Sequence, residues 1–429
     1  MDCKSSALCI FDEQDVQTDV LGSTIVDYYP LTSLSAGGPI EFHVPGSSDE
    51  YLDLNDTKLL LHVKLTKADG KPIGDSGTDK VTLSNLPIAS LFQDVFLSIG
   101  DTQVEGGQHC YPYNAYLSSL LQFHPSAKKT HMQAWGWNED TPGKFDDATN
   151  EGIKFRSKET ENSATWEMIG PLFLDMMRQE RYLLPQTDIR LRLLPSKPEF
   201  ALQVYDGTSL DYKFSITKCI LFIRRVRVND SVISGHSKGL EKFNAKYILR
   251  HMDVNSFTLT KGISHYIKDH LYSSQTPKML IVGCLEHDAF NGNIKKSPFN
   301  FQHFNLNKIG LYRDGELVPG QILHPNFSNG HFMRSYVNTM EAMNYFNTDD
   351  SNGLTMEHFK QGYTLYVFDL TPDANCEAPY RNISKSGSLR LELNFSTPLK
   401  QALNVMLFGI FDSKLEITKL RDIFMSYSR

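Results

Sequence analysis

Apolar and polar residues alternate with a period of two along much of the chain. Residues 61–66 read Leu-His-Val-Lys-Leu-Thr, residues 95–99 read Val-Phe-Leu-Ser-Ile, and residues 189–194 read Ile-Arg-Leu-Arg-Leu-Leu. Because successive side chains of a strand point to opposite faces, each segment would place one face on a core and the other toward solvent. The pattern therefore predicts a mostly β protein built from antiparallel sheets.

Two short segments have helical spacing instead. Residues 113–121 place Tyr, Tyr, Leu, Leu and Leu at the i, i+3, i+4, i+7 and i+8 positions of one helix face. Residues 331–346 form the second expected helix. Each is followed by a polar, turn-rich stretch, at residues 124–164 and at residues 347–362. Long stretches of this kind usually project from a domain, and we expect these two to project from the same end of the molecule.

The two halves of the chain repeat each other, which is the most informative feature of the sequence. Five features recur in the same order: a turn (100–101 and 314–315), a helix carrying a tyrosine (Tyr116 and Tyr336), an apolar segment ending in Asp (172–175 and 366–369), an alternating segment (189–195 and 389–395) and a long apolar strand with a charged end (219–228 and 405–417). Any two β domains share alternating strands, but five collinear matches that include a helix indicate a duplication.

The duplication predicts an all-β fold of two tandem eight-stranded jelly rolls, each with a short inserted helix. Sandwiches closed by Greek-key connections protect their sheet edges in this way. Residues 1–37 are polar ahead of the first clear strand and are predicted to be a flexible N-terminal arm. The first roll is expected at 38–228, a Gly/Ser/Asp-rich linker at 229–241, and the second roll at 242–429.

Length and charge fit this division. The chain has 429 residues, enough for two domains of about 200 residues each. Its net charge is −7, whereas a protein that coats phosphate directly usually carries a basic face. The longest basic cluster, Arg224, Arg225 and Arg227, falls inside an expected strand. No specific nucleic-acid binding is predicted.

Cysteine usage and hydropathy suggest where the chain resides. The six cysteines are scattered without a paired spacing, which favours a reduced, intracellular protein. The N-terminus carries no basic segment followed by an apolar one, and no apolar run reaches the roughly 18 residues of a membrane span. The sequence therefore predicts a soluble chain without a transmembrane segment.

One segment resembles a catalytic motif. Gly74-Asp-Ser-Gly77 is similar to the nucleophile loop of chymotrypsin-like proteases, with Ser76 as the nucleophile. Those enzymes place a catalytic His and Asp well upstream, but only His43 and His62 precede Ser76. Gly and Asp residues are also what a hairpin loop requires, so we interpret residues 67–80 as a loop.

The sequence has no pattern typical of a metal or cofactor site. The 14 histidines form neither an H-x-H nor an HExxH pattern, and the pair His265 and His270 is five positions apart. A cupin, the enzymatic jelly roll, would need paired histidines and a glutamate on neighbouring strands. The sequence contains no phosphate-binding loop and no dinucleotide fingerprint. It therefore predicts no catalytic, cofactor-binding or metal-binding residues, no cofactor, and no enzyme activity.

Several long motifs resemble one known family. In the second half they are residues 277–292, 298–304, 311–319, 329–336 and 362–373, and in the first half residues 40–46, 51–54, 91–92 and 111–116. These segments are similar to the major capsid protein of Maverick/Polinton elements and the related adintoviruses. The resemblance covers nearly the whole chain from about residue 38.

The resemblance implies a hexon-like, double jelly-roll capsid protein with no catalytic residues. Three copies would form a pseudo-hexagonal capsomer, capsomers would tile an icosahedral virion shell, and a separate penton protein would close the vertices. Assembly would take place inside the host cell, in the nucleus or the cytoplasm. The alternatives are a minor (penton) capsid protein, a jelly-roll carbohydrate-binding or cupin-like protein, and a host-captured copy with a new role. The duplication disfavours the penton protein, which needs only one roll.

Overall fold

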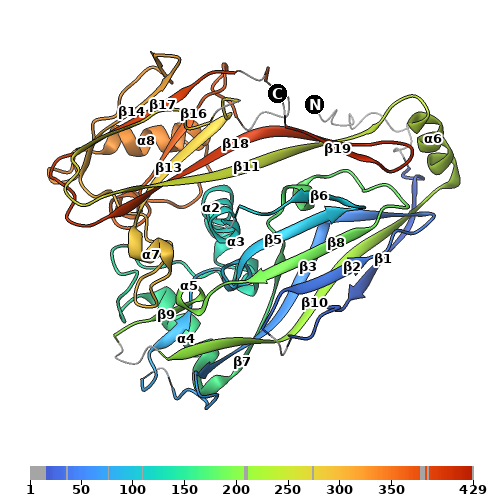
Figure 1. The fold of residues 1–429 in the computed structure, drawn as a ribbon, viewed down its shortest axis with the longest axis horizontal. Coiled ribbons are helices and arrows are strands. Elements are labelled where there is room, and N and C mark those ends of the chain that lie inside the picture. The colour runs from blue at the N-terminus through green and yellow to red at the C-terminus, as the bar shows by residue number, and fades with distance from the viewer. Residues whose placement is uncertain are drawn as a thin grey trace, which may run out of the picture.

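A computed structural model describes residues 16–34, 37–75, 77–108, 110–206, 211–272, 275–376, 382–383 and 386–427. Its strands fall into two groups that follow each other along the chain. The first group, blue to green, forms the lower part of the molecule in Figure 1, and the second, yellow to red, forms the upper part.

The first half contains β1 (Val20–Tyr28), β2 (Ile40–Val44), β3 (Glu50–Lys67), β4 (Val81–Leu83), β5 (Phe92–Ile99), β6 (Thr102–Glu105), β7 (Thr165–Pro171), β8 (Ile189–Pro195), β9 (Leu202–Val204) and β10 (Tyr212–Val228). The second half contains β11 (Ala245–Leu259), β12 (His265–Lys268), β13 (Met279–Glu286), β14 (Leu306–Arg313), β15 (Glu316–Leu317), β16 (Leu365–Asp369), β17 (Leu389–Phe395), β18 (Leu403–Ile417) and β19 (Ile423–Tyr427).

The hydrogen-bonded strand order is the same in both halves. The first half forms the sheets β1-β10-β3-β7 and β2-β8-β5-β6, and the second forms β11-β18-β13-β16 and β12-β17-β14-β15. When the eight main strands of each half are numbered along the chain, leaving out the small β4-β9 pair and β19, both halves read 1-8-3-6 and 2-7-4-5. Each half is therefore a jelly roll, and the predicted all-β fold of two tandem rolls is confirmed.

Helices fill the connections between strands. They are α1 (Pro87–Ser90), α2 (Tyr111–Gln122), α3 (Pro125–Lys128), η2 (His131–Trp135), α4 (Glu151–Thr160), η3 (Glu161–Ser163), η4 (Asp175–Arg178), α5 (Pro198–Ala201), α6 (Asp230–Leu240), α7 (His287–Asn291), α8 (Met333–Ala342) and α9 (Met356–Lys360). Both predicted helices are present, α2 between β6 and β7 and α8 at the equivalent place between β15 and β16. The first roll, however, inserts α3, η2 and α4 as well as α2.

The number of buried sheet faces explains why apolar and polar residues alternate in some strands, whereas other strands are buried along their whole length. In β8, Ile189 and Leu191 are buried while Arg190 and Arg192 are exposed, because one sheet face meets solvent. In contrast, residues 403–413 of β18 are all buried. One face of this strand packs into the core of the second roll, and the other into a core that continues into the first roll. The sheet that contains β18 is thus covered on both sides.

Two expectations differ from the structure. Residues 20–28, expected in the flexible arm, form β1 and pair antiparallel with β10, because Val20 and Tyr28 pack against the first core. The expected linker 229–241 is largely the helix α6, which the Asn229 side chain caps by accepting a hydrogen bond from Ser231 N. The repeat is inexact at one point, since residues 172–175 follow β7 and the matching residues 366–369 lie in β16.

Candidate functional site: the junction between the two rolls

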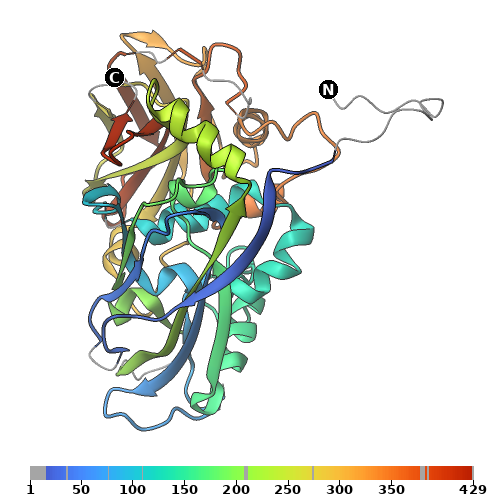
Figure 2. The same cartoon turned by 90° about the vertical axis from the view of Figure 1, so that its right-hand side faces the viewer.

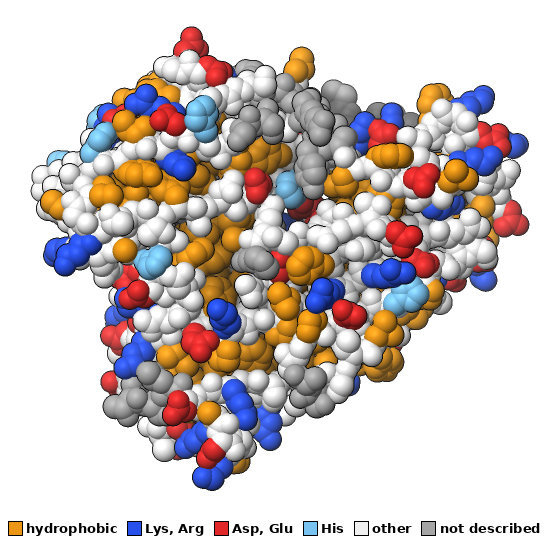
Figure 3. All heavy atoms as spheres, in the orientation of Figure 1, with side chains coloured by type: hydrophobic (Ala, Val, Ile, Leu, Met, Phe, Trp, Pro, Cys, Tyr) orange, Lys and Arg blue, Asp and Glu red, His pale blue; other side chains and the backbone are white. Residues whose placement is uncertain are grey.

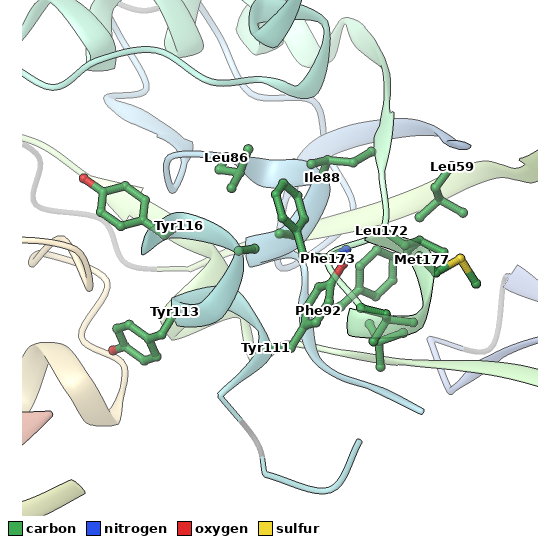
Figure 4. Packing of buried hydrophobic residues seen from close by; sticks show 14 of the residues in the cluster. Leu59, Leu86, Ile88, Phe92, Tyr111, Tyr113, Tyr116, Leu172, Phe173 and Met177 are labelled. Carbon is green, nitrogen blue, oxygen red and sulfur yellow. Dashed lines mark hydrogen bonds between the residues drawn. The ribbon is translucent and has the colours of Figure 1, made fainter. Parts of the chain in front are cut away.

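The helix α2 lies between the two rolls (Figure 1). Aromatic side chains of both rolls pack around it. Tyr116 stacks on Phe299 of the second roll, with ring centroids 4.2 Å apart and an angle of 6° between the rings. Tyr113 meets the same Phe299 edge-on at 5.7 Å. Figure 4 shows Tyr111 on the other side of the helix, near Phe92 and Phe173 of the first roll. The helix therefore belongs to both cores, which explains why ten of its twelve residues are buried rather than one face only.

The two polar insertions meet each other at the junction. Gly143 N donates a hydrogen bond to the carbonyl of Gln361 over 2.9 Å, and Tyr363 Oη donates to the carbonyl of Asp140 over 2.6 Å. His358 Nε2 lies 2.7 Å from a carboxylate oxygen of Glu139. The expectation of a simple projecting loop is wrong for residues 124–164, since Trp137, Phe145 and Arg156 in that segment are fully buried.

A buried ion pair fixes the larger insertion. Arg156 Nη2 lies 2.8 Å from Asp140 Oδ1, and both side chains are shielded from solvent. The guanidinium also donates to the carbonyls of Leu83 and Asn138, while Asn150 Nδ2 donates to Asp140. A buried charge pair is tolerated only when its remaining hydrogen-bonding groups are satisfied in this way.

Lys128 ties the insertion to the second roll. Its ammonium group donates to the carbonyl of Leu120 over 2.5 Å and to the carbonyl of Asn352, in the second insertion, over 2.6 Å. Burial lowers the pKa of Lys128 to about 8, and the nearby carboxylate of Glu139 opposes part of that fall. The contact therefore joins the two insertions through a largely enclosed cation.

Gly362 is required at the junction for two reasons. Its φ is +101°, a conformation that side chains with a Cβ rarely adopt. A Cβ at this position would also lie 2.1 Å from Cε2 of Phe145, which belongs to the first roll. The close approach of the two rolls here depends on the absence of a side chain.

A carboxyl cluster crosses the junction on the other side of α2. Glu105, at the end of β6, accepts hydrogen bonds from the backbone N–H groups of Asp175 and Met176, both over 2.7 Å. The Asp175 carboxylate lies 2.8 Å from Nδ1 of His251, which belongs to β11 of the second roll. A glutamate, an aspartate and a histidine thus connect the first roll to the second.

Burial and charge shift the titration of this cluster. Burial raises the pKa of Glu105 to about 8, and the neighbouring Asp175 carboxylate contributes to the rise. Burial alone would lower the pKa of His251, but the hydrogen bond and charge of Asp175 outweigh it, so the pKa is raised. Glu105 therefore remains protonated, and His251 charged, at higher pH than in the unfolded chain.

Three histidines noted in the sequence, His43, His62 and His270, have separate partners in the structure. Ser76 lies outside the described residues. His62 pairs with Glu167 on the neighbouring strand β7, and His43 lies 3.5 Å from Asp188. His270 hydrogen-bonds Ser388, and the described residues contain no cluster of three or more His, Cys, Asp or Glu side chains placed to hold a metal. Within the same residues, no helix is long and apolar enough to cross a membrane.

The arginine cluster in β10 has structural partners. Arg225 donates to Tyr28 Oη in β1 over 2.8 Å and lies 3.3 Å from a carboxylate oxygen of Glu50 in β3. Arg224 lies 2.6 Å from Asp56. Arg225 therefore fastens the edge strand β1 to the sheet, a role that no local sequence signal could have indicated.

The described surface retains exposed apolar side chains. In the orientation of Figure 1, hydrophobic side chains gather along the middle of the molecule, where the upper and lower rolls meet (Figure 3). On the edge strand β1 and the residues that follow it, Leu21, Ile25, Tyr29 and Leu31 are each more than half exposed. Exposed apolar side chains that gather on one face commonly mark a contact with another protein.

Solved structures with a similar fold are capsid proteins of large DNA viruses and virophages. The chain superimposes on a chain of the Sputnik virophage with a TM-score of 0.63 and 13% identity, covering 100% of this chain and 93% of that one. For the PBCV-1 virus capsid the values are 0.59 and 12%, covering 98% and 100%. For the mavirus major capsid protein they are 0.56 and 12%, covering 94% and 90%. At these identities the likeness shows the fold, the double jelly roll.

Among proteins known from their sequences, the chain is similar to the uncharacterized protein F54H12.2 of Caenorhabditis elegans. The two are 24% identical over 401 residues, which cover 91% of this chain and 94% of the nematode protein. No protein-family model matches the chain.

Proposed function

We propose that this chain is a major capsid protein with a structural, non-enzymatic role. The observation that carries the proposal is the exact repetition of strand order in two rolls that share a continuous core. A shell needs a subunit whose two halves keep a fixed relative position, and the stacked rings, joined insertions and carboxyl cluster of the junction supply this. The likeness in fold to viral capsid proteins over nearly the full chain supports the same role.

The proposal extends to a homotrimer. Two similar rolls per chain give six similar rolls in a closed threefold ring, so a trimer can occupy a sixfold lattice position without six identical chains. Closed cyclic symmetry also prevents open-ended growth within the capsomer. The interfaces of such an obligate assembly should each bury on the order of 2,000 Å² or more and be rich in aromatic residues. The chain contains 26 Phe and 19 Tyr, and some of these side chains are available for such contacts.

The proposal also covers the biological source of the protein and the proteins with which it assembles. The motif resemblance supports a capsid protein of a Maverick/Polinton element or an adintovirus, located in the virion and assembled inside the host cell. Its partners would be further copies of itself and a penton protein at the vertices. The nematode relative, similar over most of both chains, is compatible with a copy carried in an animal genome.

Electron microscopy of the purified protein tests the proposal. We expect class averages with a hexagonal outline and threefold symmetry, because the two rolls of a chain are similar but not identical. Particles that are single-chain in size at every concentration would contradict the capsomer. Averages with fivefold symmetry would instead support a penton protein.

A further inference from the structure

The connection between the rolls leaves an apolar groove open to solvent. The helix α6 lies at the edge of the molecule (Figure 1), next to the blue strand β1 (Figure 2). Beneath it lies a cavity of about 700 Å³, lined among others by Val20, Leu184, Val228 and Tyr247. We call this cavity the α6 groove. Its volume falls in the range of sites that hold a small ligand or a few side chains.

One face of α6 is turned toward the groove. The lining residues of the helix, at positions 232, 235, 236, 239 and 240, follow the i, i+3, i+4, i+7 and i+8 spacing of a single helix face. No residue of α6 is buried. Val232 and Leu240 are partly buried against the first core, and the hydroxyl of Tyr51 lies 2.7 Å from Nδ1 of His236. This face therefore touches the first roll but is open over its two glycines.

Two glycines on this face leave space. A Cβ at Gly235 or at Gly239 would meet no heavy atom within 4 Å. Glycine in the middle of a helix is destabilising relative to alanine, and here no described neighbour comes close enough to require it. At the end of the groove, Phe243 is 72% exposed. These features suit a groove that receives an apolar segment close to the helix backbone.

The position of the N-terminal chain identifies the occupant. Gln17, Asp19 and Val20 line the groove, so the chain enters the described part of the structure at its edge. Upstream lies the apolar run Ala7-Leu8-Cys9-Ile10-Phe11, and Phe11 precedes Gln17 by six positions. Six residues span up to about 20 Å when extended, so the apolar run can reach the groove.

Charge and tethering favour the same chain over another partner. The groove carries Arg181 and Lys246 together with Asp19 and Glu180, so its charges balance and the attraction has to come from apolar contact. A short tether gives the chain's own segment a high effective concentration at the groove, which a second copy lacks. We propose that the α6 groove binds residues 7–11 of the same chain. This inference is independent of the proposed capsid function.

A disulfide test uses the native Cys9. In a Cys3→Ser background, Val232→Cys places a thiol on the groove face of α6, and Ser234→Cys places one on its exposed face. The buried thiols will not interfere, since burial raises the pKa of Cys219 and of Cys284 to about 12. Mild oxidation should join Cys9 to the cysteine at 232 within one chain, seen as a linked peptide by mass spectrometry. The Ser234→Cys variant should form at least tenfold less, and Cys9→Ser should abolish the link.

The other outcomes overturn the proposal. A disulfide between two chains would assign the groove to a second copy. Equal linkage at positions 232 and 234, or none at either, would show that the segment does not dock.

A second pair of variants avoids engineered thiols. Gly239→Leu should fill the groove and release the segment, so that chymotrypsin cleaves after Phe11 at least tenfold faster than in the unmodified chain. Gly262→Leu, at another glycine with no atom near its Cβ, is the control for general destabilisation. Unchanged cleavage in Gly239→Leu would contradict the proposal. The outcome of both tests depends only on where residues 7–11 bind and not on whether the protein forms a capsomer.

Discussion

Tyr116 of the first roll and Phe299 of the second stack face to face, with their ring centroids 4.2 Å apart. Both side chains are fully buried, and the stack sits where the core of one roll continues into the other. Offset or parallel aromatic pairs contribute about 0.5–1.5 kcal/mol beyond the apolar area that they bury. The relative position of the rolls therefore depends on the same kind of packing that holds each roll together.

Replacing Tyr116 tests this coupling. Tyr116→Ala should lower the free energy of unfolding by about 3–5 kcal/mol, the usual cost of removing a large buried ring. Tyr116→Phe is the matched control, because it keeps the ring that stacks on Phe299 and removes only the hydroxyl group, so it should cost about 1 kcal/mol or less. Chemical denaturation followed by circular dichroism measures both. If Tyr116→Ala cost less than about 1 kcal/mol, the stack would not hold the junction.

Gly362→Ala tests the contact between the insertions. The new Cβ would be held in a left-handed conformation and would collide with Phe145, so we expect a loss of about 3 kcal/mol or more in stability. Gly330→Ala separates the two effects, since Gly330 has a φ of +74° but no atom within 4 Å of a Cβ. That control should cost about 1–2 kcal/mol, from the backbone alone. Equal losses in the two variants would show that the approach of Phe145 is unimportant. Thermal unfolding provides the comparison.

The carboxyl cluster predicts a pH dependence. Glu105 has a pKa of about 8 in the folded protein and near 4.5 when unfolded, so the folded state binds more protons between these values. Stability should therefore fall as the pH rises from about 5 to 8, by up to about 1.4 kcal/mol per pH unit. His251 acts in the same direction, since its raised pKa keeps it charged after the unfolded chain has lost the proton.

Glu105→Gln should flatten this dependence, because the amide cannot ionise. Denaturation midpoints measured at several pH values between 5 and 8 provide the slope. The exposed Glu151→Gln serves as the control and should leave the slope unchanged. An identical slope in Glu105→Gln and the unmodified chain would mean that another group controls the pH response.

The exposed apolar side chains of β1 are expected to lie in a contact between subunits. Ile25→Asp would bury a charge in that contact and should raise the concentration needed for trimer formation at least tenfold. The adjacent Thr24 is also exposed but points to the other side of the strand, so Thr24→Asp is the control. Analytical ultracentrifugation measures both. Equal behaviour of the two variants would remove β1 from the interface.

The sequence was sufficient to predict the fold but not the junction. Alternation in residues 189–194 and the repeat of five features led to two jelly rolls, because periodicity records which face of each strand is buried. The pairing of Asp175 with His251, or of Phe145 with Gly362, depends on how the two rolls are placed, and no local pattern contains that information. The strand β1 was missed for a similar reason. Its pattern is weak, and Arg225, far along the chain, holds it in place.

The insertion at residues 124–164 shows another limit. Its polar and turn-rich composition is typical of a projecting loop. The charged residues Arg156 and Asp140 also favour a solvent-exposed segment when only the sequence is considered. The charges are instead buried against each other and against backbone carbonyls. Composition alone does not distinguish a satisfied buried ion pair from a solvated surface one.

The mass of the purified protein in mild buffer tests the capsomer account most directly. Light scattering coupled to size-exclusion chromatography at micromolar concentration should give about three times the 48.7 kDa of one chain. A stable mass of one chain across the micromolar range, with no particles formed under any condition, would contradict the account.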